Sequence, residues 1–477
     1  MRAGSEPDRC GMLDDVTESI WEDATSQAAA IRSGATSASE LVETYLERIA
    51  RHDPGLAAYV AVDSAGARSA ARAADAAVAA GGPEARRPFL GVTISIKDVI
   101  DVAGLATTHS CKALVDAVAA ADDPLVRRLR DAGFVVLGKT HVPEFCTSMT
   151  ASELHGICRN PWDPERTPGG SSGGASAALA AGLCAIAHGT DGAGSVRVPA
   201  AFCGLVGIKP TRGLVSFGTE AGNPYFGTSV DGALSRTVRD AAALVDVFAG
   251  RREPVLADEC ADGMAAPRLR IALTTSAPFG TVDEECARAA RDTAEVLAGL
   301  GHHVEERTPR WDVILAAALG PMSVPGMAGL VPVEQVGLLE PRNRPMLERL
   351  AALTVVEHSQ WVDQCRAASV EFSAFWDDID LLVSPTAGVV APSVDWAPWD
   401  QSPEDHMATF AGFPNFAQPF NLSGQPAISV PVGWSREGLP IGVQLAGRRF
   451  DEATLVRVAR QLELAMPWSD RRPPTAL

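Results

Sequence analysis

The feature that most constrains this chain is a glycine- and serine-rich block between Arg166 and Gly213, RTPGGSSGGASAALAAGLCAIAHGTDGAGSVRVPAAFCGLVGIKPTRG. Two glycine-rich stretches each present a serine, Ser171 in the first and Ser195 in the second. Glycine is favoured where the backbone must turn tightly or approach another chain segment closely. The residues between the two stretches are small, and we expect them to form a helix that joins two glycine loops.

A lysine upstream of this block supplies a candidate base. Lys97 lies in the apolar run GVTISIKDVI. A serine hydroxyl is a poor nucleophile until a base removes its proton, and neither PGGSSGG nor DGAGS contains a histidine. Burial among valine and isoleucine would lower the pKa of Lys97 by disfavouring the ammonium form. We therefore expect a neutral Lys97 to act as the base for the serines of this block, as in an acyl-transfer site that uses no histidine.

Two familiar motifs in the same region predict other chemistry, but their local sequence is wrong for it. Residues 133–140 match the phosphate-loop pattern GxxxxGK[ST], but the four interior residues are Phe, Val, Val and Leu, which are typical of a buried strand. Residues 170–174 match GxSxG around Ser172. The preceding PERTPGG is a loop rather than a strand, and the best later histidine is His406 in EDHMATF.

Composition excludes several classes of protein. The chain has 477 residues, of which 46% are hydrophobic, and a net charge of -18, which argues against a nucleic-acid partner. Nine cysteines without a CxxC pair predict reduced thiols and a cytoplasmic location. The nine histidines form no HExxH motif, so we expect no metal and no cofactor. The N-terminus lacks the apolar core of a signal peptide, and the apolar run 177–187 is too short to span a membrane.

The order of patterns along the chain predicts an α/β fold. Residues 1–14 are expected to be a flexible tail, and 15–80 show helical periodicity. Strands and helices alternate through 85–250. Helical patterns return from 311 and give way to a Pro- and Trp-rich loop, so that 311–416 form one variable region. Residues 417–477 read as two strands and a helix. Together these patterns predict an α/β protein with a largely parallel or mixed sheet and helices on both faces.

Several stretches resemble the amidase signature family: NPWDPERTPGGSSGG, AHGTDGAGSVRVPAAFCGLVGIKPTRG, SIKD, GKTHVPEF and FNLSGQPAISVPVGWSREGLPIGVQLAGRRFDEATLVRVA. The resemblance runs from about residue 17 to 465 and is weakest over 251–375. It implies a single domain over 15–477 with a large mixed, twisted sheet, in which 85–250 hold the catalytic core, 311–416 form the substrate mouth and 417–477 return to the core. It also implies an amidase that hydrolyses linear amide C–N bonds.

The resemblance assigns a role to each residue of the candidate triad. Lys97, Ser171 and Ser195 match the family's lysine, bridging serine and nucleophilic serine. In the family a cis peptide bond precedes the bridging serine, which here is the Gly170–Ser171 bond.

Further residues are expected around this triad. Backbone N–H groups of Gly192, Ala193 and Gly194 would form the oxyanion hole, although alanine at 193 limits positive φ. Asp191 and Arg197 would form a supporting ion pair, and Ser172 would hydrogen-bond within its loop. By the same resemblance, Met149 and Thr150 would line the acyl pocket.

The substrate and the partners are less constrained. The aromatic-rich region 311–416 favours small, hydrophobic amides, as in an aryl acylamidase, and the same triad could cleave carbamates or urethanes. The protein is expected to act as a monomer or a homodimer. The alternative is the A subunit of a glutamyl-tRNA amidotransferase, a glutaminase that works in a complex. That amidotransferase chain typically has glutamine where Val198 stands here.

Overall fold

The structure is a computed structural model that describes residues 19–215, 227–251, 253–261, 267–318 and 330–474. The tail expected at residues 1–14 lies outside these ranges. One sheet of eleven strands runs through the domain, and β4 pairs with β5 in a separate two-stranded ribbon. The strands are β1 (Tyr59–Val62), β2 (Thr93–Lys97), β3 (Val135–Thr140), β4 (Ala151–Ser152), β5 (Gly156–Ile157), β6 (Ile186–Asp191), β7 (Val206–Lys209), β8 (Val230–Ser235), β9 (Arg270–Leu273), β10 (His303–Glu306), β11 (Leu381–Pro385), β12 (Ala427–Trp434) and β13 (Pro440–Gly447).

The sheet is mixed, as expected. Its strand order is β1-β3-β2-β6-β8-β7-β12-β13-β11-β9-β10. The strands β3, β2 and β6 are parallel, and so are β11, β9 and β10, whereas the strands between these two groups pair antiparallel. The last two strands of the sequence, β12 and β13, therefore lie inside the sheet rather than at its edge.

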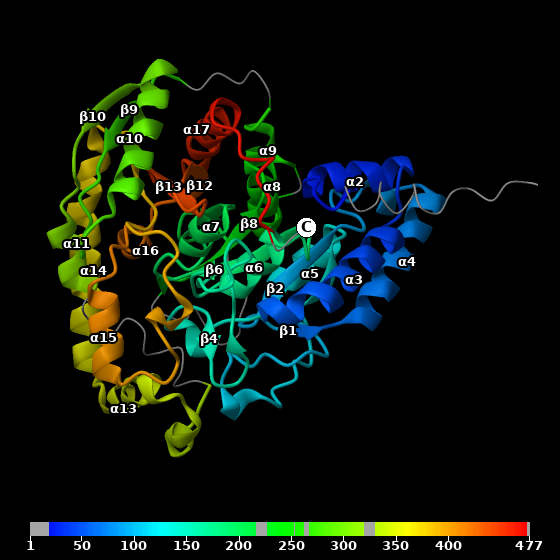
Figure 1. Cartoon of the computed structure of the whole chain (residues 1–477), viewed down its shortest axis with the longest axis horizontal. Helices are drawn as coiled ribbons and strands as arrows, with labels where there is room; N and C mark the ends of the chain where they lie inside the picture. Colours follow the sequence, from blue (N-terminus) through cyan, green and yellow to red (C-terminus); the bar gives the residue numbers. More distant parts are fainter. Residues whose placement is uncertain (1–18, 216–226, 252, 262–266, 319–329, 475–477) are drawn as a thin grey trace, which may run out of the picture.

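Helices surround the sheet. They are α2 (Ala24–Ser33), α3 (Ala38–Leu56), α4 (Ser64–Ala80), α5 (Pro124–Asp131), α6 (Gly173–Ala180), α7 (Arg197–Cys203), α8 (Val238–Phe248), α9 (Val255–Asp258), α10 (Glu284–Gly299), α11 (Trp311–Ala318), α13 (Arg344–Ala352), α14 (Val355–Ser373), α15 (Pro403–Ala411), α16 (Pro419–Ser423) and α17 (Glu452–Ala465). In Figure 1 the N-terminal helices lie at the right, and α11 and α14 lie at the left beside β9 and β10. Within the described ranges, no helix is both long and apolar enough to cross a membrane.

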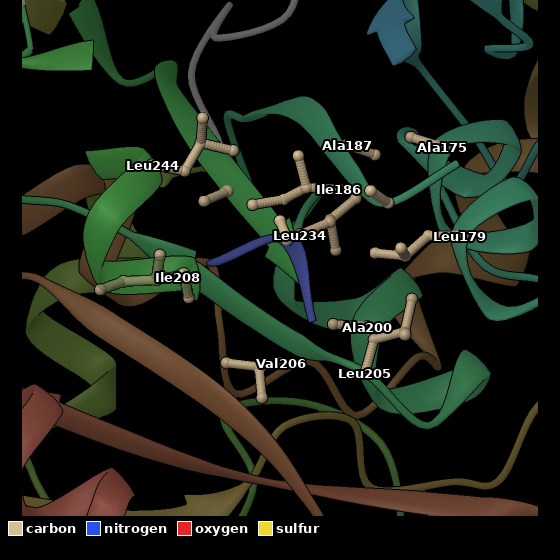
Figure 2. Packing of buried hydrophobic residues seen from close by; sticks show 14 of the residues in the cluster. Ala175, Leu179, Ile186, Ala187, Ala200, Leu205, Val206, Ile208, Leu234 and Leu244 are labelled. Atoms are coloured by element: carbon tan, nitrogen blue, oxygen red, sulfur yellow. The ribbon is translucent and has the colours of Figure 1, made fainter. Parts of the chain in front are cut away.

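Both faces of the sheet are covered by helices. Successive residues of a strand point to opposite faces, so their contacts show which helices cover each face. On β7, a side chain at Gly207 would meet Ala200 of α7. On the other face, the ring of His188 from β6 contacts Phe248 of α8, with ring centroids 5.7 Å apart. Figure 2 shows the buried core close to the serine-bearing loops, where α6, β6, α7, β7, β8 and α8 contribute apolar side chains. The helix of small residues expected between the two glycine loops is α6, which is buried along its whole length.

The structure confirms most of the predicted elements and corrects one. The apolar run around Lys97 contains β2, and the GxxxxGK[ST] match runs into β3, so this match is a strand rather than a phosphate loop. Residues 15–80 are not wholly helical, because β1 lies between α3 and α4. This strand has four residues and is held by antiparallel pairing with β3, a long-range contact that periodicity does not reveal.

Candidate active site

Lys97 is the last residue of β2, and its side chain is completely buried. Its Nζ lies 2.7 Å from Ser171 Oγ, 2.8 Å from Thr190 Oγ1 and 3.1 Å from the Thr190 carbonyl oxygen. The backbone N–H of Lys97 donates to His188 Nδ1 at 3.4 Å. The lysine is therefore fixed at both its backbone and its amine.

These three partners suit a neutral amine as well as an ammonium. A neutral amine has two N–H groups and one lone pair. The Thr190 carbonyl can only accept, and Thr190 Oγ1 can accept a second N–H, which leaves the lone pair of Nζ directed to the hydroxyl of Ser171. In this protonation state Ser171 is the donor and Lys97 is the acceptor. The arrangement is the one that a base needs.

The electrostatic surroundings of Lys97 act in opposite directions. Burial lowers the pKa of its ammonium below the ordinary value. The nearby Cys146 and the carboxylates of Asp191 and Asp231 oppose that shift. Asp231 itself pairs with the buried ring of His188, with Nε2 and Oδ1 3.0 Å apart. The desolvation effect is the largest, so the pKa of Lys97 is lowered overall.

The two serine loops contact each other through their backbones. The Gly170–Ser171 peptide bond is cis, as the family resemblance implied. The N–H of Ser172 donates to the carbonyl of Ser195 at 3.0 Å, and Ser172 Oγ donates to the Thr190 carbonyl at 3.3 Å. Ser195 is half-buried. The hydrogen bond expected between Ser171 Oγ and Ser195 Oγ is absent among the contacts of the described residues.

The backbone N–H groups of the loop around residues 192–194 differ in whether another group of the protein already accepts a hydrogen bond from them, and the N–H of Gly194 is the bonded one. The N–H of Gly194 donates to Asp191 Oδ1 at 2.8 Å, so in this structure it is already bonded. Gly192, Ala193 and Ser195 provide the other N–H groups of the loop. Gly194 has a φ of 106°, whereas Ala193 is not among the residues with positive φ. Alanine at position 193 is therefore compatible with the loop.

Asp191 and Arg197 form the expected ion pair, and both are fully buried. Two bonds join them, Arg197 Nε to Asp191 Oδ2 at 3.0 Å and Arg197 Nη2 to Asp191 Oδ1 at 2.8 Å. Asp191 also accepts from the N–H groups of Gly194, Val196 and Arg197. Burial by itself would raise the pKa of Asp191, but the guanidinium of Arg197 holds it well below its usual range.

Three amide side chains from the C-terminal part of the chain complete this network and were not predicted. Asn421 Nδ2 donates to the Asp191 carbonyl at 2.7 Å, and Asn421 Oδ1 accepts from Arg197 at 2.6 Å. Gln444 Oε1 accepts from Arg197 at 2.7 Å. Asn415 Nδ2 donates to the Ala193 carbonyl at 2.8 Å. Thr190 was also missed, although its place beside Asp191 in HGTDGAGS offered a signal.

The two residues expected in the acyl pocket differ in their surroundings. Thr150 Oγ1 donates to the Gly169 carbonyl at 2.9 Å and accepts from Gly173 N at 3.1 Å, so its hydroxyl braces the loop that carries Ser171. Met149 is buried in an apolar cluster with Val198 and Phe413. This cluster lies beside both serine loops, because Val198 follows Ser195 by three residues and Met149 lies against Gly170.

Comparison with known proteins gives a consistent result. The family model for amidase matches residues 40–456. The 6-aminohexanoate-cyclic-dimer hydrolase of Pseudomonas sp. (strain NK87) is 37% identical over 497 residues, covering 95% of this chain and 97% of that protein. The acylamidase of Rhodococcus erythropolis is 33% identical over 475 residues, covering 96% of this chain and 98% of that protein.

Solved structures agree with these sequence relatives. The structure of 6-aminohexanoate cyclic dimer hydrolase complexed with substrate has a TM-score of 0.84 at 34% identity, covering 96% of this chain and 100% of that one. The A subunit of glutamyl-tRNA(Gln) amidotransferase from Thermotoga maritima has a TM-score of 0.70 at 30% identity, covering 90% of this chain and 92% of that one.

Proposed function

Because the chain belongs to the amidase family and is an enzyme that hydrolyses amide C–N bonds, we propose that Lys97, Ser171 and Ser195 are its catalytic residues. The observation that carries this proposal is the 2.7 Å contact between Lys97 Nζ and Ser171 Oγ. A buried amine with a lowered pKa, fixed against a serine hydroxyl, is what a base needs in order to activate a serine.

The proposed reaction has two stages. Ser195 Oγ attacks the amide carbonyl carbon while its proton passes to Ser171 Oγ and the proton of Ser171 passes to Lys97 Nζ. The relay then runs in reverse and protonates the nitrogen, so the C–N bond breaks and an amine leaves an acyl-enzyme. Water, deprotonated through the same relay, cleaves the ester and releases the carboxylic acid. The direct contact missing between Ser171 and Ser195 would form when substrate orients the half-buried Ser195 hydroxyl.

The oxyanion is proposed to bind to backbone N–H groups of the loop that precedes Ser195. Gly192, Ala193 and Ser195 are the preferred donors, because the N–H of Gly194 already donates to Asp191. Each such donor typically contributes about 3–4 kcal/mol to transition-state stabilisation. Asp191, Arg197 and Ser172 would hold the loops in place without contacting substrate.

The proposed substrates are small hydrophobic amides. The apolar cluster of Met149, Val198 and Phe413 extends to the partly buried rings of Trp396 and Phe410, whose centroids lie 5.3 Å apart. Aromatic and aliphatic side chains of this kind favour an alkyl or aryl acyl group. Carbamates present the same carbonyl and the same nitrogen leaving group, so we include them among the candidate substrates.

The test is hydrolysis of a panel of anilides, aliphatic amides, esters and carbamates by the wild type and by three variants. Ser195→Ala is expected to lower kcat/KM by about 10⁴-fold or more, because it removes the nucleophile, and Lys97→Ala is expected to act similarly. Ser172→Ala is the matched control, since the hydroxyl of this neighbouring serine donates to the backbone carbonyl of Thr190. An active Ser195→Ala together with an inactive Ser172→Ala would refute the assignment.

The amidotransferase alternative has weaker support. The T. maritima protein superposes less well than the cyclic dimer hydrolase, with TM-scores of 0.70 and 0.84. Val198 is buried in the apolar cluster, where a side chain that binds glutamine would be polar. We propose that the purified chain hydrolyses amides without a partner. Release of ammonia from glutamine only when a partner is present would instead support the alternative.

We also propose a cytoplasmic enzyme that works as a monomer or a homodimer. The described cysteines are all free, and most are buried, which suits a reducing compartment. Light scattering during gel filtration gives the oligomeric state directly, and fractionation of the source cells gives the location. A larger assembly, or recovery of the chain outside the cytoplasm, would contradict this proposal.

A further inference from the structure

A cavity of about 710 Å³ opens beside α14, at the carboxyl end of α16 and next to the loop that follows β7. α14 and α16 pack against each other and lie at the left of Figure 1. The described residues that line the cavity include three arginines, Arg212, Arg366 and Arg449, and neither aspartate nor glutamate. Its apolar lining residues include Trp361, Leu422 and Val370.

Three arginines around one cavity stand out in this chain, which carries 59 acidic and 41 basic residues. Arg366 pairs with Asp363 on α14, with Nη1 and Oδ1 3.6 Å apart. Neither Arg212 nor Arg449 pairs with a carboxylate in the part of the chain that the structure describes. Burial, followed by the like charge of Arg449, lowers the pKa of Arg212, although an arginine stays protonated. An anion bound between these two guanidinium groups would offset their mutual repulsion.

A purely structural role accounts for part of this arrangement. Arg212 Nη1 donates to the carbonyls of Asn421 and Leu422, at 3.3 Å each, and Arg449 Nη2 donates to the Ser423 carbonyl. The two arginines thus cap the last turn of α16. A guanidinium has five N–H groups, so these bonds leave other donors of both residues at the cavity. Arg366, which lines the cavity from α14, does not take part in this capping and pairs with Asp363 instead.

We propose that this cavity binds a small organic carboxylate with an apolar body. The carboxylate would lie between Arg212 and Arg449, since guanidinium groups match carboxylate geometry and charge. The apolar body would lie along Trp361 and Leu422. A cavity of this volume is in the range that holds small-molecule ligands.

The proposed site is distinct from the catalytic centre. Leu422 lines the cavity, whereas its neighbour Asn421 points its side chain to Asp191 and Arg197. The helix α16 therefore separates the bound carboxylate from the loop of Ser195. The ligand class includes acids that amide hydrolysis releases, but binding here does not depend on that reaction.

Calorimetric titration with 4-phenylbutyrate tests the proposal, with 4-phenylbutanol as the uncharged analogue. Val370 lines the cavity on α14 and is 75% exposed, so its replacement leaves the core intact. We expect Val370→Asp to weaken carboxylate binding by about tenfold and Val370→Lys to preserve or strengthen it, because the two change only the sign of the added charge. Val355→Asp, on the same helix and 85% exposed but outside the lining, should bind like the wild type.

A second arm distinguishes this cavity from the catalytic centre. Wild-type protein whose Ser195 has been blocked with phenylmethanesulfonyl fluoride should bind 4-phenylbutyrate with unchanged affinity. The proposal is overturned if the blocked protein no longer binds, if the alcohol binds as tightly as the carboxylate, if Val370→Asp and Val355→Asp bind alike, or if no heat is detected with the wild type. Only the blocked-protein arm relies on a reactive Ser195. The other outcomes do not depend on whether the enzyme hydrolyses amides.

Discussion

Replacing Thr190 with valine should move the pH dependence of the enzyme without removing any group that reacts. Thr190 Oγ1 lies 2.8 Å from Lys97 Nζ, and valine preserves the shape of the side chain while removing this acceptor. The Thr190 carbonyl and Ser171 Oγ remain as partners of the amine. The change therefore isolates one hydrogen bond to the proposed base.

The size of the effect follows from the two charge states of Lys97. A hydrogen bond to a charged group contributes about 1.5–3 kcal/mol, and one between neutral groups about 0.5–1.5 kcal/mol. Losing the acceptor thus disfavours the ammonium over the neutral amine by about 1.4 kcal/mol, which is about one pKa unit. The pKa of Lys97, already lowered by burial, should fall further.

The assay is the pH profile of kcat/KM for an anilide. Activity rises as Lys97 loses its proton, so a lower pKa moves the ascending limb of the profile to lower pH, by about one unit. Thr190→Ser retains the hydroxyl and should retain the wild-type profile. An ascending limb that stays in place or moves to higher pH in Thr190→Val would refute the reasoning, even if the maximal rate fell.

Three further changes test other polar side chains, the first two of them near Ser195 and the third at the end of α3. Asn415→Ala removes the bond to the Ala193 carbonyl and should lower kcat by about tenfold with little change in KM, and a rise in KM alone would contradict this. Asp191→Asn leaves Arg197 without its buried counter-charge and should cost about 3–5 kcal/mol in chemical denaturation. Because the pKa of Asp191 is depressed in the folded state, the wild type loses stability as pH falls. If Asp191→Asn lost as much stability at low pH as the wild type, that account would be contradicted. Burial raises the pKa of Asp53 to about 6, so the wild type loses stability as pH rises from about 4 to about 6. In Asp53→Asn the melting temperature should no longer fall over this pH range.

The candidate triad could be found from the sequence because its surroundings are local. Ser171 and Ser195 are each marked by glycines within two residues, and Lys97 is marked by the apolar strand that carries it. The hydrogen bonds within these loops could not be predicted from the sequence. Nothing in DGAGS indicates that the N–H of Gly194 is bonded to Asp191, since that bond depends on how the carboxylate is turned by Arg197.

The amide side chains around Arg197 could not be found from local sequence patterns. Asn421 and Gln444 lie 224 and 247 residues from Arg197 in the sequence. They reach it because β12 pairs with β7, and β13 pairs with β12. Strand order is set by the packing of the whole sheet, and each strand alone carries only a short apolar pattern. The strand β1 was missed for the same reason.

The position of β12 and β13 also bears on how the enzyme is made. Among the described strands, β9, β10 and β11 join the rest of the sheet only through the pairing of β11 with β13. Until residues 427–447 emerge from the ribosome, the earlier strands can therefore form only two separate parts of the sheet, with unpaired edges at β7 and β11. Such exposed edges invite association between nascent chains. Because Gln444 arrives on β13, the buried guanidinium of Arg197 also lacks one acceptor until then, so the loop of Ser195 gains its full support only after this strand has been added.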